Sequence, residues 1–193
     1  LSLHDALPIL AAIEWAIETR KDADTSNDIQ IISMSLASKS GVTALEAACS
    51  KAYDSGILLI AAAGNDGNIE GKGDSVVYPA AYSSVIAVAA IDSLNKRASF
   101  SSTGPAVELA APGVNILSIS YQDGLTSLNG TSMACPHVAG TAALVLAANP
   151  SFTNDKVRDR LAQTATDLGT PGRDKLYGYG LVNAEAAASA RTL

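Results

Sequence analysis

Two uninterrupted apolar runs constrain the fold of this chain more than any other feature. They read ILLIAAAG (57–64) and SVIAVAAID (84–92). A strand that is apolar at nearly every position is buried on both faces, as in a parallel sheet covered by helices on both sides. A third, isoleucine-rich run, IQIISMSL (29–36), has a similar character. The three runs therefore predict a buried, mostly parallel sheet.

Segments with the apolar spacing of helices alternate with these runs. They cover 8–20, 41–56, 132–148, 153–163 and 183–190. Thr43 is the expected N-cap of the second segment and Gly56 its stop, and Thr153 is expected to cap the fourth. Residues 93–130 are richer in Gly, Ser and Pro, which predicts short strands and loops. We therefore predict a single α/β domain of three layers, a mostly parallel sheet with helices on both faces and no internal linker.

The composition narrows the classes of function. A chain of 193 residues, 48% of them hydrophobic, is long enough for one domain with a substantial core. The net charge of −6 argues against nucleic-acid binding, which needs clustered Lys and Arg. We also expect no membrane span, because no apolar run approaches the roughly 18 residues that one requires. Cys49 and Cys135 lack the spacing of metal ligands, so we expect buried thiols rather than a metal site or a disulfide.

One candidate for chemistry is Ser132, in the stretch NGTSMACPHVAG (129–140). A serine hydroxyl becomes a nucleophile only when a base lies within hydrogen-bond reach and is itself oriented. The free N–H groups at the start of a helix favour developing negative charge, and the small neighbours Gly130 and Ala134 leave room for a substrate backbone. Taken alone, this motif is explained more simply by Thr131 or Ser132 as the cap of a core helix.

A second candidate is Asn65, in the stretch AAAGNDG (61–67) at the end of a predicted buried strand. Ligands of parallel α/β sheets bind at the carboxyl ends of the strands. A side-chain amide can donate a hydrogen bond to an oxyanion without changing its own charge. Asn and Gly also favour ordinary turns, so this stretch by itself is better explained as a turn.

Taken together, the two stretches resemble the subtilisin-like serine proteases. NGTSMACPHVAG is similar to the nucleophile motif of that family and AAAGNDG to its oxyanion motif. Further similar segments, in the order of the family, are IEWAI (13–17), IISMSLAS (31–38), RASFSSTGP (97–105), LAAPG (109–113) and YGYGLVNAEAA (177–187). The resemblance covers roughly residues 9 to 190 and implies a subtilisin-like α/β fold and serine endopeptidase chemistry.

The resemblance also implies roles for individual residues. Ser132 would attack the scissile carbonyl, and Asn65 would donate to the oxyanion together with the backbone N–H of Ser132. An extended peptide or protein substrate would pair with the backbone of Ser35, Leu36 and Ala37. The wall of the primary specificity pocket would be formed in part by Ala62, Ala63 and Gly64. Val77 stands where glycine is common in better-known subtilisins, so a narrower pocket is expected.

The general base and the orienting carboxylate are not found among the matching residues. His137 lies five positions after Ser132, which on one helix places the two side chains roughly 140° apart. His4, beside Asp5, lacks the glycine-rich surroundings of the family's catalytic histidine. Residues 1–8 match nothing in the family and are expected to be a non-native extension, with residues 9–193 a partial peptidase domain. We therefore expect a fragment that is inactive alone and poorly soluble.

The family also suggests features that leave no side-chain signature. The chemistry requires no cofactor, but a structural calcium or monovalent cation is expected at the backbone oxygens of Ala80, Tyr82 and Val85. The peptide bond between Tyr78 and Pro79 is often cis in the family. By family analogy we expect a secreted bacterial protein, with peptide or protein as substrate, no nucleic-acid or membrane partner, and a monomeric state when complete.

Two alternative functions remain to be weighed. An esterase of the α/β-hydrolase type would need an acid and a histidine after the serine. His137 is the only later histidine, and it is expected to face away from Ser132, so this alternative fails. A catalytically dead, subtilisin-like peptide-binding module would explain the missing base. It would have no chemical need for both Ser132 and Asn65, so the fragment of an active protease is the preferred hypothesis.

Overall fold

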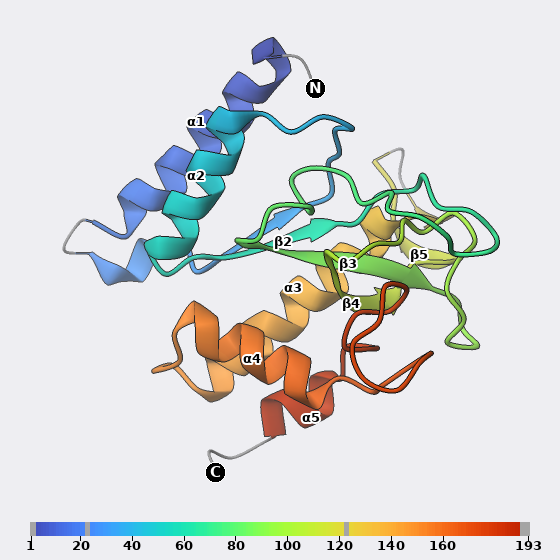
Figure 1. Cartoon of the computed structure of the whole chain (residues 1–193). Helices are drawn as coiled ribbons and strands as arrows, with labels where there is room; N and C mark the ends of the chain where they lie inside the picture. Colours follow the sequence, from blue (N-terminus) through green and yellow to red (C-terminus); the bar gives the residue numbers. More distant parts are fainter. Residues whose placement is uncertain (1–2, 22–23, 122–123, 190–193) are drawn as a thin grey trace.

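A parallel sheet of four strands forms the centre of the molecule. The computed structural model describes residues 3–21, 24–121 and 124–189 (Figure 1). The strands lie in the order β1-β2-β3-β4, and each neighbouring pair is parallel. Their bounds are β1 Ile31–Met34, β2 Leu58–Ala62, β3 Val85–Ile91 and β4 Val107–Pro112. The predicted parallel sheet is therefore confirmed.

Helices cover both faces of this sheet. On one face lie α1 and α2, and on the other lie α3, α4 and α5 (Figure 1). The helix bounds are α1 Leu3–Thr19, α2 Thr43–Asp54, α3 Thr131–Ala148, α4 Asn154–Thr164 and α5 Ala184–Ser189, with a short 3-10 turn η1 at Thr25–Asn27. The three-layer α/β architecture expected from the sequence is thus present.

The alternation of side chains along β2 explains why its sequence is apolar throughout. Successive side chains of a strand point to opposite faces. Leu59 and Ala61 accordingly join the core under α1 and α2, whereas Leu58 and Ile60 join the core against α3. All five residues of β2 are buried. Such a strand has no solvent face, so no polar residue interrupts it.

Details of the helix ends differ from the sequence prediction. α1 begins at Leu3 rather than at Pro8. Thr43 is the first residue of α2 and not its N-cap; Val42 holds the cap position, and no side chain bonds there. Gly56 does follow the end of α2, in the left-handed region with φ +86°. Thr153 caps α4 as predicted, with its hydroxyl accepting from the backbone N–H of Lys156.

Two short strands complete the structure of the region 93–130, in which short strands and loops were expected. β5 (Ile116–Ile119) and β6 (Leu125–Leu128) form an antiparallel hairpin. Most residues of this hairpin are exposed, in contrast to the buried central strands. The predicted last helix reaches Ala190, which lies outside the described residues.

Helix α3 has an unexpected composition. Contrary to the expectation from the sequence, it is long and apolar enough, by length and hydropathy alone, to cross a membrane. The core helix of a folded domain meets the same criteria. Here the sheet accounts for the apolar side chains, because Ala134, Val138 and Val145 are buried in the core against β2 and β3.

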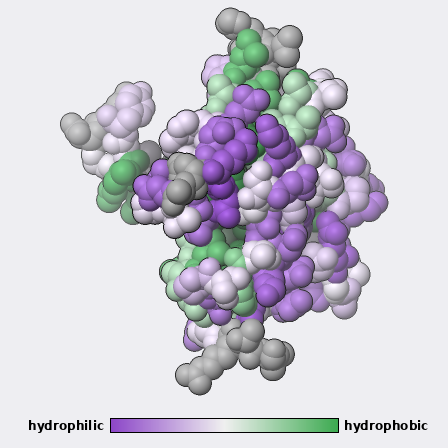
Figure 2. Space-filling model, turned by 90° about the vertical axis from the view of Figure 1, so that its left-hand side faces the viewer, coloured by the Kyte–Doolittle hydropathy of each residue, from purple (hydrophilic) through white to green (hydrophobic). Residues whose placement is uncertain are grey.

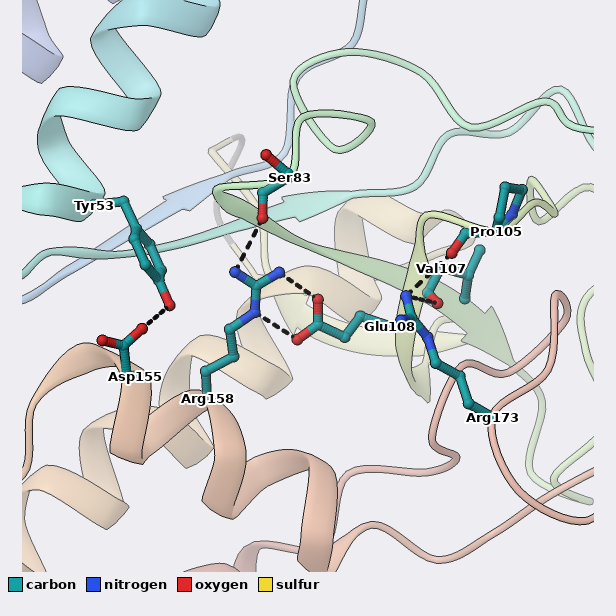
Figure 3. A network of polar contacts seen from close by, with 8 residues as sticks. All are labelled: Tyr53, Ser83, Pro105, Val107, Glu108, Asp155, Arg158 and Arg173. Carbon is teal, nitrogen blue, oxygen red and sulfur yellow. Dashed lines mark hydrogen bonds and ion pairs between the residues drawn. The ribbon is translucent and has the colours of Figure 1, made fainter.

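The β4 edge of the sheet is closed by the C-terminal part of the chain. The backbone of Ala110 donates to the carbonyl of Gly180 at 2.8 Å and accepts from Val182 at 2.9 Å. Glu108 forms two hydrogen bonds with the guanidinium of Arg158 on α4, at 2.7 and 2.6 Å (Figure 3). These contacts fix α4 and the following loop to the outermost strand.

The β1 edge is bordered by apolar hollows. One of about 500 Å³ lies between α1 and β1, and one of about 460 Å³ lies on the other face, between β1 and α3. Figure 2 shows apolar side chains gathered toward the upper end of the molecule, where α1 begins. Leu7 and Trp15 of α1 are exposed.

Candidate functional site

The candidate site lies where the carboxyl end of β2 meets the start of α3. β2 ends at Ala62, and the chain turns at Gly64, which has φ +110°. A Cβ at Gly64 would lie 2.8 Å from Ser102 Oγ and 2.8 Å from Val77 Cγ2. Only glycine fits this turn, because it tolerates both the left-handed backbone and the close packing.

Asn65 is held in one orientation by Thr131. Its Oδ1 accepts from the backbone N–H of Thr131 at 3.0 Å and from the Thr131 hydroxyl at 3.1 Å. The same hydroxyl accepts from the backbone N–H of Gly64 at 3.1 Å. These bonds to the oxygen fix the orientation of the amide, and its Nδ2 group is the hydrogen-bond donor of the side chain. Within the described part of the chain, no acceptor bonds it.

The amide of Asn65 and the first turn of α3 face the same place. A Cβ at Gly130 would lie 3.6 Å from Asn65 Nδ2 and 3.6 Å from the backbone nitrogen of Ser132. Gly130 precedes α3 with φ +154°, so the chain enters the helix directly beside Asn65. Free N–H groups of a first helical turn and a side-chain amide together form a cradle for negative charge.

Ser132 stands between two hollows. One, of about 260 Å³, also contains Asn65 on its wall, and the other, of about 390 Å³, is lined by the start of α3 and by β5. The Ser35 hydroxyl donates to the backbone carbonyl of Ser132 at 2.8 Å, which ties the segment after β1 to the helix. Within the described ranges, no hydrogen bond occupies the Ser132 hydroxyl. It is therefore open to a ligand from either side.

Most of the predicted substrate-binding residues line the 260 Å³ hollow. They are Ser35, Leu36, Ala37, Ala62 and Gly64. Ala63 does not line it; its side chain is fully buried in the core on the α1 and α2 side. Val77 also lines the hollow and packs against Gly64, and the expected narrowing of the pocket by its side chain stays a prediction.

Two features of this hollow, an ion pair and the role of Thr131, were not predicted from the sequence. Lys39 and Asp66 form an ion pair of 3.2 Å between two walls of the hollow, with side chains 83% and 48% exposed. Thr131, considered only as a helix cap, holds the Asn65 amide. The position of Thr131 directly before Ser132 could have indicated its role in the site. Nothing in the sequence indicates that Lys39 and Asp66 form an ion pair.

His137 shares the 390 Å³ hollow with Ser132, which the helical separation had not suggested. Its Nδ1 is engaged at 2.8 Å by the backbone carbonyl of Met133, one turn earlier in α3. The two side chains form no hydrogen bond with each other in the described structure. The side chains of His4 and Asp5 lie outside the described residues.

Both cysteines are buried and unpaired, as predicted. Cys135 lies beneath the site, with Sγ 3.5 Å from Ser33 Oγ and 3.5 Å from the carbonyl oxygen of Ile60. Burial raises the pKa of the Cys135 thiol from its ordinary value. Burial, and next the charge of Glu46, raises the pKa of Cys49 to about 11. Both thiols are therefore protonated and unreactive at neutral pH.

Of the residues expected to hold a cation, Ala80 and Tyr82 lie in the turn before β3 and Val85 is the first residue of β3. The carbonyl of Tyr82 already accepts from the backbone N–H of Val85 at 3.0 Å, and the side chain of Ala80 is buried. Ser84 Oγ in the same turn is buried without a hydrogen-bond partner among the described residues, so an oxygen donor for a hard cation is available. The Tyr78–Pro79 peptide bond is cis.

Comparisons with known proteins agree on one family. The model of the subtilase family (Peptidase S8) matches residues 5–180. The chain is 51% identical to subtilisin DY of Bacillus licheniformis over 180 residues, 93% of this chain and 61% of that protein. It is 50% identical to a thermostable alkaline protease of Halalkalibacterium halodurans over 179 residues, 93% of this chain and 45% of that protein.

A solved structure gives the same result for the fold. Sphericase superposes with a TM-score of 0.82 at 33% sequence identity, covering 90% of this chain and 62% of sphericase. The chain therefore spans about half the length of the relatives that it matches, between 44% and 61% for the subtilisins.

Proposed function

This chain belongs to the subtilase family, and from that premise we propose that it is the part of a serine endopeptidase that carries the nucleophile and the oxyanion donors. One observation above all supports the proposal. Thr131 occupies the Asn65 amide oxygen with two hydrogen bonds, which leaves the Nδ2 group beside the backbone N–H of Ser132. A pair of donors directed at one place next to a serine hydroxyl is what acyl transfer requires.

In the proposed reaction, Ser132 Oγ attacks the carbonyl carbon of the scissile peptide bond while its proton passes to a general base. The carbonyl oxygen becomes an oxyanion that accepts from Ser132 N–H and Asn65 Nδ2. Collapse of this tetrahedral intermediate breaks the C–N bond, and the protonated base returns the proton to the leaving amine. Water then hydrolyses the acyl-enzyme by the same route, with the base taking a proton from water.

The general base and the carboxylate that orients it would come from a part of the protease outside this chain. His137 is a poor substitute, because its side chain forms no hydrogen bond with the Ser132 hydroxyl in the described structure and its Nδ1 bonds the Met133 carbonyl rather than a carboxylate. The 390 Å³ hollow on the β5 side of Ser132 is where a base would have to reach the hydroxyl. We therefore expect the 193-residue chain alone not to turn over substrate.

The substrate would lie as an extended strand against residues 35–37, with one side chain in the 260 Å³ hollow. Ala62 and Gly64 would form part of its wall, whereas Ala63 does not line the hollow. Val77 on the wall of this hollow would favour a small or medium side chain over a large aromatic one. A cation bound by the carbonyls of Ala80, Tyr82 and Val85 would be structural and would take no part in the chemistry.

Labelling of the complete protease with a fluorophosphonate, followed by mapping of the modified residue, tests the assignment of Ser132. We expect modification at Ser132 only, and none in the Ser132→Ala variant. Modification of another serine would refute the assignment.

A casein assay of the 193-residue chain tests the expected inactivity. Hydrolysis that survives His4→Ala and disappears in Ser132→Ala would show that the chain supplies its own base.

Cell location, partners and assembly belong to the same proposal. Relatives of this chain come from bacteria, and one is named a minor extracellular protease, from Bacillus subtilis. We therefore propose a secreted bacterial enzyme that acts on peptides or proteins as a monomer, without a nucleic-acid or membrane partner.

A further inference from the structure

The loop that carries Asn65 is bonded along its length to residues 97–102. The Gly64 carbonyl accepts from the backbone N–H of Ser102 at 2.9 Å, and the Gly67 N–H donates to the carbonyl of Phe100, also at 2.9 Å. A Cβ at Gly67 would lie only 2.0 Å from the Ser101 carbonyl oxygen, so the two backbones are in direct contact. The position of Asn65 therefore depends on the segment behind it.

Arg97 is the charged residue of that segment, and its guanidinium bonds carbonyl oxygens on both sides of the contact. Its Nη1 donates to its own segment, at 2.9 Å to Ala98, 3.3 Å to Ser99 and 2.7 Å to Ser101. Its Nη2 donates to the loop after Asn65, at 2.5 Å to the carbonyl of Asn68 and 3.3 Å to that of Ile69. One side chain thus fastens the Asn65 loop to its support.

The surroundings of Arg97 set it apart from an ordinary surface arginine. Among the side chains that the structure describes, no carboxylate forms an ion pair with its guanidinium. Its backbone N–H donates to the Tyr177 hydroxyl at 3.1 Å. Burial lowers the pKa of Arg97 from its ordinary value, while Tyr177 acts in the opposite direction. A planar guanidinium has five donors in a fixed fork, which lysine cannot reproduce.

We propose that Arg97 is a positioning residue for the oxyanion donor, holding Asn65 in its catalytic place through the carbonyls of Asn68 and Ile69. The inference rests on the proposed function and adds to it a residue that touches neither substrate nor nucleophile. Arg97 acts through the loop geometry, so its loss should affect the transition state rather than substrate binding.

The test is a double-mutant cycle in the complete protease, with a tetrapeptide p-nitroanilide as substrate. Asn65→Gly should lower kcat by about 10²–10³, a magnitude taken from subtilisin itself. Arg97→Met should lower kcat by roughly tenfold at nearly unchanged KM, because a small misplacement of a catalytic group is costly. In the Asn65→Gly background, Arg97→Met should lower kcat little further. Equal losses of kcat from Arg97→Met in both backgrounds would overturn the inference.

Arg173→Met is the matched control. Arg173 also donates to carbonyls, those of Pro105 and Val107, at 3.1 and 3.3 Å (Figure 3), and these bonds end on the segment before β4 and on β4 rather than on the loop after Asn65. Its loss should leave kcat unchanged. If Arg173→Met lowers kcat as much as Arg97→Met does, Arg97 has only a general structural role.

Arg97→Lys keeps the experiment decisive if Arg97→Met does not fold. It should give an intermediate kcat and faster amide exchange in peptides covering 65–73. Wild-type kcat and exchange in Arg97→Lys would refute the inference. Wild-type kcat in Asn65→Gly would instead refute the proposed function, because Arg97 would then have no donor to position.

Discussion

The two edges of the central sheet end in opposite ways. The outer strand β4 is buried along almost its whole length, and the segment around residues 179–182 pairs with it. The outer strand β1 is only partly buried and, within the described structure, pairs with β2 alone. An apolar hollow borders β1 on each face of the sheet.

This difference indicates which contacts stabilise the described part of the protein. The β4 edge combines backbone pairing, a bidentate ion pair and close glycine packing, so damage there should unfold the chain. The β1 edge offers unpaired backbone beside apolar surface, which is a template for a further strand or for association. Substitutions at the two edges should therefore have different consequences, large for stability at β4 and large for association at β1.

The largest effect is expected for Gly178→Ala, beside β4. Gly178 has φ +64°, and a Cβ there would lie 2.2 Å from the carbonyl carbon and oxygen of Glu108. Because backbone atoms cannot yield as a flexible side chain does, the 174–182 segment would have to leave the edge. We expect a loss of about 4 kcal/mol or more in the free energy of unfolding, measured with urea.

Gly172→Ala is the matched control for this substitution. Gly172 has φ +84°, and a Cβ there would meet no atom within 4 Å. Only the left-handed backbone opposes the change, at a cost of about 1–2 kcal/mol. Equal losses from the two substitutions would mean that the packing against Glu108 does not matter.

The second largest effect concerns the ion pair at the same edge. The side chains of Glu108 and Arg158 are only 8% and 20% exposed. Burial alone would lower the pKa of the Arg158 guanidinium, but the bonds and charge of Glu108 outweigh burial and raise it. Removing one partner leaves a buried charge uncompensated, so Glu108→Leu should cost about 3–5 kcal/mol in the free energy of unfolding.

The double variant Glu108→Leu with Arg158→Met isolates the cause. Replacing both charges by apolar groups is often neutral or stabilising, so the double variant should be more stable than Glu108→Leu alone. A double variant at least as unstable as the sum of the two single variants would contradict this explanation.

The contrast between the two edges also shows which parts of the fold could be predicted from the sequence. The apolar run of β2 predicted a strand buried on both faces, because such a run has no other stable place in a folded domain. Gly56 and Thr153 predicted helix ends correctly, since their effects are local. Thr43 was assigned as a cap wrongly, because the backbone bends one residue earlier, at Val42, and no local pattern distinguishes the two positions.

The site was predictable only in part, for a similar reason. Ser132 and Asn65 stand in contiguous motifs, and the structure brings both to one cradle. The bonds of Arg97 end on carbonyl oxygens, which every residue has, so they leave no signature in the sequence. The Lys39–Asp66 ion pair joins two distant loops and depends on the fold itself.

A third prediction concerns the layer of helices near the open edge. Burial, followed by the charge of Glu46, raises the pKa of Cys49 on α2 to about 11, from an ordinary value of 9.0. The unfolded thiol ionises first as the pH rises. Stability that is complete below pH 9 should therefore decline between pH 9 and 11, by on the order of 2 kcal/mol.

The measurement is the free energy of unfolding from pH 8 to 11 for the wild-type chain and for Cys49→Ala. Other groups titrate in both proteins, so the difference in slope isolates Cys49. Equal slopes would mean that the open edge leaves α2 loosely packed and its thiol solvated.

The smallest effect on stability, but a clear effect on association, is expected at β1. Ile32 is partly buried and lines the 500 Å³ hollow between α1 and β1. Ile32→Lys should cost only about 1 kcal/mol in the free energy of unfolding. A charge in this hollow should also oppose pairing of the exposed strand with another chain, since edge lysines prevent such association.

Sedimentation of the 193-residue chain at several concentrations measures this effect. We expect the wild-type chain to associate and Ile32→Lys to shift toward monomer, because the aggregating surface is the β1 edge. Leu94→Lys is the control, since it removes an apolar side chain that is 73% exposed in the turn after β3. If Leu94→Lys restores the monomer equally well, the open edge is not the source of association. The same conclusion follows if the wild-type chain is already monomeric and unfolds cooperatively. In either case the contrast between the two edges concerns stability alone.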